Sequence, residues 1–149
     1  MKKYLLPLAL AATLASPVVL AQDCTIDLDS SDQMRFDKSA ITVTSSCKEI
    51  TVRLRHSGKL PVNAMGHNVV ITQTDVYQAV AQDGVKAGLA NHYVPANDKR
   101  VIAFTKLIGG GETTSIKFPG TRLTAGGDYT FFCSFPGHWT LMVGKLKVE

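Results

Sequence analysis

The chain has 149 residues, of which 45% are hydrophobic and 19% are charged, and its formal net charge is +4. This length suits one domain with a proper core. The chain has 16 basic and 12 acidic residues. Two of the basic residues, Lys2 and Lys3, lie in an expected leader, and without them the net charge is only +2. An excess this small, without a basic run, gives no indication of nucleic-acid binding.

The first 21 residues are typical of a cleaved signal peptide. Lys2 and Lys3 precede a mostly apolar run, and Ala21 ends a small-residue cleavage site. The run is too short, and wrongly flanked, to be a good membrane span, and no later run is long enough. A lipoprotein would need a cysteine directly after the cut, whereas Cys24 lies three residues beyond it. We therefore expect export to a bacterial periplasm, with no membrane insertion of the mature domain at residues 22–149.

Alternating apolar and polar residues, separated by glycine and proline turns, predict about eight short strands along this domain. In one of them Ile50, Val52, Leu54 and His56 share a face, so His56 is expected to be a hydrogen-bonded core histidine. It could also sense pH near a site. The expected strands cover residues 24–29, 41–46, 49–56, 67–72, 101–108, 113–118, 128–133 and 140–148.

One short helix interrupts the strands. Thr74 can cap it, residues 75–83 form it, and Gly84 closes it. Residues 85–99 have no regular pattern, and His92 among them is expected to be solvated. The pattern as a whole predicts an all-β fold: a two-sheet Greek-key sandwich with one inserted helix.

Three cysteines are an odd number for an oxidising compartment. Cys24 and Cys47 are the natural disulfide pair, because both lie early and flank a hairpin-like region. The closed loop would stabilise the fold by roughly 3 kcal/mol in the chain-entropy model. Cys133 is then left over, as a free thiol or a metal ligand.

Cys133 lies in the sequence YTFFCSFPGHWTLMVG, which also holds His138 and Met142. The turn at Pro136-Gly137 lets one short loop present all three side chains to a single ion. A thiolate, an imidazole and a thioether are soft ligands that suit copper before zinc, calcium or magnesium. The sequence MGHN supplies a second histidine, His67, directly before a strand that is expected to be central.

Each of these residues also has an ordinary structural explanation. A lone His67 is more often a hydrogen-bonded strand-end histidine, Met142 a filler of the core, and Cys133 an inert buried thiol. Together they favour a metal site, since a free thiol between such residues in an exported protein would otherwise risk oxidation. A trigonal site with two histidines, a cysteine and a distant methionine is the geometry described for blue copper centres.

The other polar residues give no indication of catalysis. Asp75, Asp83 and Asp98 are scattered, without the spacing of paired catalytic carboxylates. No serine-histidine-aspartate context, phosphate-binding glycine loop or cysteine-rich zinc pattern occurs. We expect no enzymatic activity and no small-molecule substrate.

Beyond these residues, the chain resembles the azurins, small bacterial blue copper proteins of the cupredoxin family. The likeness extends over essentially the whole mature region and includes CTIDL, DQMRF, AITV, GKLP, MGHN, GLANHYV, RVIAFTKLIGGGE and YTFFCSFPGHWTLM. It implies copper bound closely by His67, Cys133 and His138. Met142 would be the axial ligand, and the carbonyl oxygen of Gly66 a distant contact on the opposite side.

The resemblance also implies a disulfide between Cys24 and Cys47 and a tether between the two ligand loops at Asn68. The implied function is outer-sphere electron transfer, with copper cycling between Cu(I) and Cu(II). Partners would be redox proteins such as cytochromes c or periplasmic reductases, docking at an apolar patch around the exposed edge of His138. The matching patch positions are Met34, Leu60, Ala64, Met65, Phe135, Pro136 and Leu141.

The alternative function is a periplasmic copper-binding or copper-delivery protein without redox traffic. Such carriers usually expose methionine- or histidine-rich tracts, whereas this ligand set looks closed. The sequence departs from azurins in two places: Val69 stands where they often have a core tryptophan, and Trp139 follows His138. Trp139 is expected on the surface, at the docking face, although an inward, packing role is the other possibility.

Overall fold

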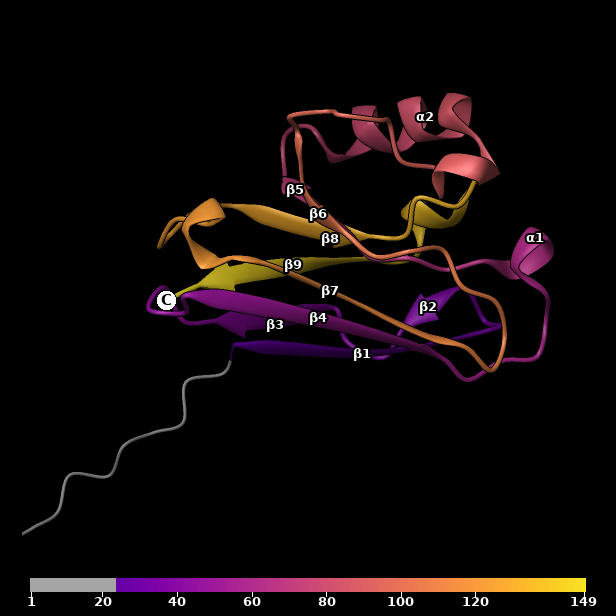
Figure 1. Ribbon diagram of the computed structural model, residues 1–149, viewed down its shortest axis with the longest axis horizontal. Helices are drawn as coiled ribbons and strands as arrows, with labels where there is room; N and C mark the ends of the chain where they lie inside the picture. The colour runs from indigo at the N-terminus through magenta and orange to yellow at the C-terminus, as the bar shows by residue number, and fades with distance from the viewer. Residues whose placement is uncertain (1–23) are drawn as a thin grey trace, which may run out of the picture.

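Two mixed β-sheets packed face to face make up the protein (Figure 1). The computed structural model describes residues 24–149, and the signal peptide predicted at residues 1–21 lies outside them. The first sheet has the order β2 (Arg35–Phe36), β1 (Thr25–Ser31), β4 (Glu49–His56), β7 (Thr113–Pro119). The second has the order β3 (Ala40–Val43), β9 (Val143–Val148), β8 (Tyr129–Phe132), β5 (Val70–Gln73), β6 (Val101–Phe104).

The predicted two-sheet sandwich is confirmed. Strand β1 runs parallel to β4, and β3 parallel to β9, while the other neighbours are antiparallel. The parallel pairs arise because the chain leaves the first sheet after β2 to form β3 in the second, then returns to form β4. The two-residue strand β2 was not predicted, since so short a segment has no visible alternation.

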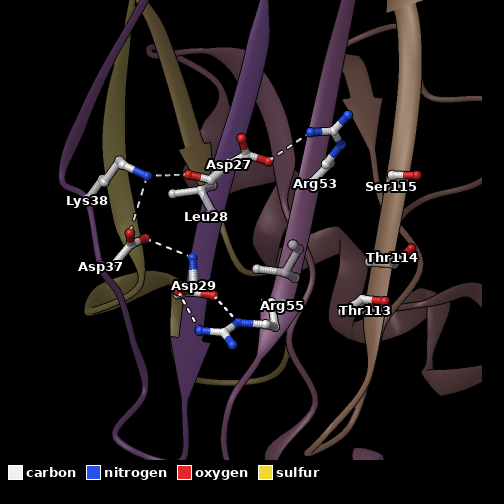
Figure 2. A pocket seen from close by; sticks show the side chains of 11 residues that line it. Asp27, Leu28, Asp29, Asp37, Lys38, Arg53, Arg55, Thr113, Thr114 and Ser115 are labelled. Atoms are coloured by element: carbon white, nitrogen blue, oxygen red, sulfur yellow. Dashed lines mark hydrogen bonds and ion pairs between the residues drawn. The ribbon is translucent and has the colours of Figure 1, made fainter.

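The core lies between the sheets, and alternation along the strands fills it. In β4 the inward residues Ile50, Val52, Leu54 and His56 are buried, and the alternate residues face solvent. On the outer face of this sheet, Asp27 and Asp29 of β1 lie opposite Arg53 and Arg55 of β4 and form ion pairs with them (Figure 2). This face is therefore a solvated surface of cross-strand pairs.

The predicted disulfide between Cys24 and Cys47 is present, with Cα atoms 5.6 Å apart. It joins the start of β1 to the segment that precedes β4. Of the cysteines that the structure describes, Cys133 alone is free, and it is buried.

The helix α2 (Tyr77–Ala87) packs on the outer face of the second sheet (Figure 1). Its buried residues Val80, Ala81 and Gly84 face a small cluster that includes Val70 and Phe132. Short turns of 3₁₀ helix follow at Leu89–Asn91, Gly120–Arg122 and His138–Thr140, and a single turn of helix, α1, spans Val62–Met65. Within residues 24–149, no helix has both the length and the apolar character needed to span a membrane.

The predicted limits of α2 were wrong at both ends. Thr74 does not cap the helix, because its hydroxyl bonds instead to Asp128, just before β8, and to Thr130 within β8. Gly84 does not end it either. A Cβ at Gly84 would lie 2.1 Å from the carbonyl oxygen of Tyr93, so only glycine lets the helix pack this closely against the Tyr93 backbone.

Strands β5 and β6 are shorter than the predicted segments 67–72 and 101–108. His67 forms only an isolated bridge, with Ile108, before β5 begins at Val70. The ligand candidate thus lies just outside the sheet, two residues after α1 ends at Met65. Figure 1 shows α1 at the end of the sandwich opposite the C-terminus.

Candidate metal centre

Three adjacent strands bring the candidate ligands together. β8 pairs with β5 on one side and β9 on the other, and the residue pairs Val70–Phe132 and Phe132–Val143 mark the shared end. His67 lies just before β5, Cys133 directly follows β8, and His138 is on the loop that leads to β9. The loop turns back through Gly137, whose φ of 83° lies in the left-handed region that favours glycine.

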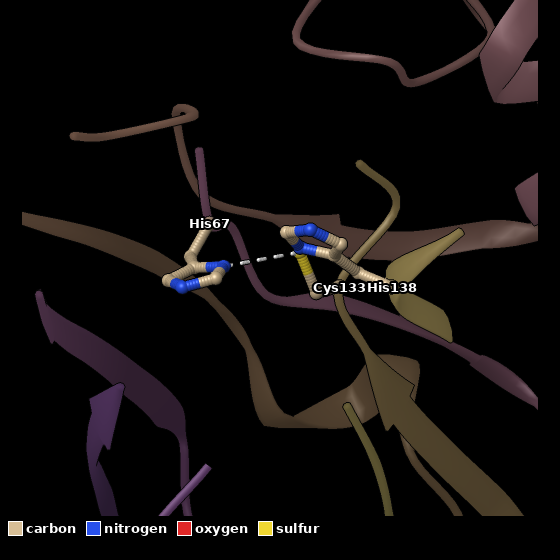
Figure 3. A group of neighbouring side chains, drawn as sticks. All are labelled: His67, Cys133 and His138. Atoms are coloured by element: carbon tan, nitrogen blue, oxygen red, sulfur yellow. Dashed lines mark hydrogen bonds between the residues drawn. The ribbon is translucent and has the colours of Figure 1, made fainter. Parts of the chain in front are cut away.

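The side chains of His67, Cys133 and His138 converge, and their ligand atoms all lie within 4.8 Å of one another (Figure 3). The Cys133 sulfur is 3.9 Å from Nδ1 of His67 and 3.7 Å from Nδ1 of His138. An ion bound in trigonal geometry, with ordinary metal–nitrogen and metal–thiolate bonds of about 2.0–2.3 Å, would set each separation near 3.8 Å. Both sulfur–nitrogen separations therefore suit a metal ion held between Cys133 and the two histidines.

Hydrogen bonds fix the orientation of His67. Its Nε2 donates to the carbonyl oxygen of Ser31 at 2.9 Å, which leaves the Nδ1 lone pair facing Cys133. The buried ring of His56 stacks on it, with centroids 4.4 Å apart. His56 in turn bonds through Nε2 to the carbonyl oxygen of Met65 and through Nδ1 to the N–H of Gly58. The prediction that His56 is a satisfied core histidine is confirmed.

The ring of His138 packs on Phe135, with centroids 4.5 Å apart. Nδ1 of His138 faces the Cys133 sulfur. Among the residues that the structure describes, no group bonds to Nε2 of His138. Every fully buried side-chain nitrogen there has a hydrogen-bond partner, so Nε2 is not fully buried. That edge of His138 therefore touches solvent, although the residue is only 3% exposed.

Burial keeps the metal-free ligands uncharged. It lowers the pKa of His67 and of His138 to about 4, and the neighbouring histidines contribute in the same direction. Burial also raises the pKa of the Cys133 thiol to about 12, against the opposing effect of hydrogen bonds from the backbone N–H groups of Asn68 and Phe135. These two N–H groups point at the Cys133 sulfur, which would become a thiolate when a metal binds.

Asn68 joins the two ligand loops. Its Oδ1 accepts a hydrogen bond from the backbone N–H of Ser134 at 2.9 Å. Its Nδ2 lies 2.8 Å from the Ser134 hydroxyl and donates to the carbonyl oxygen of His92 at 2.9 Å. The residue after His67 is thus bonded to the residue after Cys133, which is the tether that the resemblance implied.

His92 was expected to be solvated, and this was wrong. It is half-buried, and its Nδ1 accepts the backbone N–H of Leu107 at 3.3 Å. No local sequence pattern could have indicated these bonds, since they join the irregular segment to distant parts of the chain.

The two weaker ligand candidates lie beside the trio. The carbonyl oxygen of Gly66 is 3.8 Å from the Cys133 sulfur. Met142 is fully buried, and its carbonyl oxygen accepts the N–H of Cys133 at 3.0 Å. Copper coordination by these two residues stays a prediction.

Trp139 does not lie on the surface as we expected. It is half-buried and packs, with Tyr77 and Val143, against the cluster beneath α2 that includes Val70 and Phe132. The 3₁₀ turn His138–Thr140 gives the reason, because consecutive residues in a helical turn point in different directions. Val69, where azurins often have tryptophan, is a buried part of the main core.

Two of the scattered acidic residues, Asp83 and Asp98, form ion pairs. Arg100 bonds to both Asp83 and Asp98, which keeps the pKa of each carboxyl group below its usual range. This network attaches α2 to the start of β6 and leaves no free carboxylate pair there for acid–base chemistry.

Comparison with known proteins agrees with this site. Residues 22–149 match the family described as copper binding proteins, plastocyanin/azurin family. An azurin of Bordetella pertussis is 55% identical over 147 residues, covering 99% of this chain and 97% of the relative. An azurin of Pseudomonas aeruginosa is 46% identical over 149 residues, the full length of both chains.

Among solved structures, an azurin from Methylomonas sp. strain J superposes with a TM-score of 0.81 at 45% identity, covering 85% of this chain and 98% of that one. Copper is therefore the metal that His67, Cys133 and His138 are arranged to hold. The chain belongs to the plastocyanin/azurin family of copper-binding proteins.

Proposed function

We propose that this protein is a periplasmic electron carrier in which one copper ion exchanges single electrons with other proteins. The observation that carries the proposal is a buried, preformed ligand trio with one histidine edge at the surface. When bound, copper supplies one-electron chemistry between Cu(I) and Cu(II). His67, Cys133 and His138 would hold it closely, and Met142 and the Gly66 carbonyl oxygen would be weaker contacts.

The surrounding residues keep this ligand set in one geometry. The Ser31 carbonyl fixes His67, the Asn68 tether fixes the segment after Cys133, and Phe135 packs on His138. Ligands held in this way need little movement when the charge of the site changes, and this favours fast electron transfer. Burial of the whole trio disfavours copper delivery, because an acceptor protein could not reach the ligands.

Electrons would pass through the solvent-touching edge of His138, where an apolar patch supports brief docking of redox proteins such as cytochromes c or periplasmic reductases. The predicted patch residues include two strongly exposed leucines, Leu60 at 42% and Leu141 at 64%. The remaining members are exposed or half-buried, and they are Met34, Ala64, Met65, Phe135 and Pro136.

Cu(II) added to the purified metal-free protein tests the copper site. We expect an intense blue thiolate-to-copper absorption band and the matching EPR spectrum, both lost in Cys133→Ser. A colourless complex in the unsubstituted protein would exclude a blue copper centre.

Stopped-flow mixing with a reduced cytochrome c tests the carrier role. We expect Leu141→Lys to lower the second-order rate about tenfold, as loss of a central contact does. Val85→Lys is the matched control, since Val85 is also an exposed apolar residue, at 42%, but lies on α2. Equal rates for the two variants would rule out docking at the patch, and slow transfer with rapid copper loss would favour copper delivery.

Residues 1–21 would direct export and be removed. N-terminal sequencing of the protein from a periplasmic fraction tests this, with Gln22 expected as the first residue.

A further inference from the structure

His92 and Tyr93 are two consecutive non-glycine residues in the left-handed backbone region, with φ of 56° and 54°. This conformation is unfavourable for such residues, and it persists only where the surrounding structure enforces it. Strained positions of this kind are found preferentially at functional sites. The contacts of the pair therefore need an explanation.

His92 contacts the tether between the ligand loops. Its carbonyl oxygen accepts hydrogen bonds from Asn68 Nδ2 at 2.9 Å and from the Ser134 hydroxyl at 3.3 Å. With the Asn68–Ser134 bonds, these close a ring of three residues around the base of the Cys133 loop. The ring of His92 is itself anchored by the N–H of Leu107.

Tyr93 reaches the other side of the same loop. Its ring meets Phe135 edge-on, with centroids 5.3 Å apart, and Phe135 packs on His138. Behind it, the Tyr93 carbonyl oxygen lies against Gly84 of α2, where a Cβ would leave no room. The pair thus stands between α2 and the loop that carries both Cys133 and His138.

We propose that His92 and Tyr93 are positioning residues that brace the Cys133–His138 loop, and that their left-handed conformation places the His92 carbonyl oxygen on the Asn68–Ser134 tether. Neither residue belongs to the ligand trio. They act through Asn68, Ser134 and Phe135, so the segment from α2 to residue 93 forms part of the support of the metal centre.

Amide hydrogen exchange in the metal-free protein tests this inference. We expect His92→Ala to speed exchange of the Ser134 N–H by about tenfold relative to the Phe131 N–H, because the tether opens locally without global unfolding. Tyr93→Ala should have a smaller effect in the same direction. His92→Asn should behave nearly like the unsubstituted protein, since asparagine tolerates the left-handed region and its side-chain oxygen can accept the Leu107 N–H.

Asn97 offers a matched control. It is also left-handed, with φ of 55°, and it is exposed in the same segment. Asn97→Ala introduces the same backbone strain as His92→Ala, and Asn97→Gly the same flexibility as His92→Gly. The glycine pair keeps the comparison possible if an alanine variant does not fold.

The inference is supported if His92→Ala and His92→Gly speed Ser134 exchange while Asn97→Ala and Asn97→Gly leave it unchanged. It is overturned if the variants at the two positions lower stability equally while the ratio of Ser134 to Phe131 exchange stays constant. In the copper-loaded protein, His92→Ala should also shift the thiolate-to-copper band, which a merely structural residue would not do. This last measurement rests on the proposed function, whereas the exchange ratio does not, so the two can fail separately.

Discussion

The buried histidines of the metal centre should make the metal-free protein sensitive to mild acid. His67 and His138 are 0% and 3% exposed, and burial lowers the pKa of each to about 4 in the folded protein. In the unfolded chain each returns to about 6.5. Between these values the unfolded chain binds protons that the folded protein does not, so stability is complete above pH 6.5 and falls as the pH decreases toward 4.

The size of the effect follows from the two pKa values. At pH 5 protonation of the unfolded chain lowers the free energy of unfolding by about 2 kcal/mol per histidine, and at pH 7 by only about 0.2 kcal/mol. Lowering the pH from 7 to 5 should therefore reduce the free energy of unfolding by about 3–4 kcal/mol for the pair. This is a large part of the roughly 5–15 kcal/mol that stabilises a typical domain.

Urea unfolding of the metal-free protein at pH 7, 6 and 5 measures this loss, provided that the dependence on urea stays constant. His138→Gln removes one titrating ring and should halve the loss. The carboxylates that form ion pairs, such as Asp29, have a lowered pKa, and their contribution is lost mainly below pH 4, outside this range. A free energy of unfolding that stays flat from pH 7 to 5, or a loss unchanged in His138→Gln, would refute the reasoning.

Three further predictions concern other parts of the fold. Copper uptake at pH 7 should release about one proton, from Cys133, because the histidines are already neutral; calorimetry in buffers of different ionisation enthalpy measures this number. Replacing both Cys24 and Cys47 by serine should lower the free energy of unfolding by about 3 kcal/mol, as the loss of a loop with a separation of 23 residues predicts, and urea unfolding checks it. Trp139→Ala should destabilise the fold by about 2 kcal/mol, since the ring is only partly buried, and leave the rate of electron transfer unchanged in stopped-flow experiments. A slower rate at unchanged stability would instead place Trp139 at the docking face.

Strand positions were predictable where alternation is strong. β4 matched the predicted segment at both ends, because its inward-facing residues alternate over four positions, Ile50, Val52, Leu54 and His56. Strand ends near the metal centre were predicted less well. The segments at 67–72 and 101–108 are apolar enough to continue as strands, but His67 and Ile108 make only a single bridge there.

The limits of α2 could not be predicted from local signals. Thr74 and Gly84 have the residue types of a helix cap and a helix end, but contacts with residues far away in the sequence give each of them a different role. The Thr74 hydroxyl is held by Asp128 and Thr130, and Gly84 is required by the carbonyl oxygen of Tyr93. Trp139 was misplaced for a similar reason, since its direction depends on a 3₁₀ turn and on the cluster beneath α2.

Residue types and their spacing were enough to predict the chemistry of the site. An odd cysteine in a chain with a predicted export signal, beside a histidine and a methionine on one loop, already indicated a soft metal ligand set. Residue type and spacing are sufficient here because ligand softness belongs to the side chains themselves. The same holds for the sandwich, whose alternation is a local property of each strand.

How that site is held follows from contacts that the folded chain creates. The tether from Asn68 to Ser134 and the hydrogen bonds of the His92 carbonyl oxygen to these two residues join segments that are far apart in the chain. His56 stacks on His67 across the segment that holds α1. Hydrogen bonds and ring contacts of this kind depend on where the strands end and how the loops meet, and no periodicity in the sequence records them. The identity of the ligands can therefore be read from residue types, whereas their assembly and rigidity are properties of the whole fold.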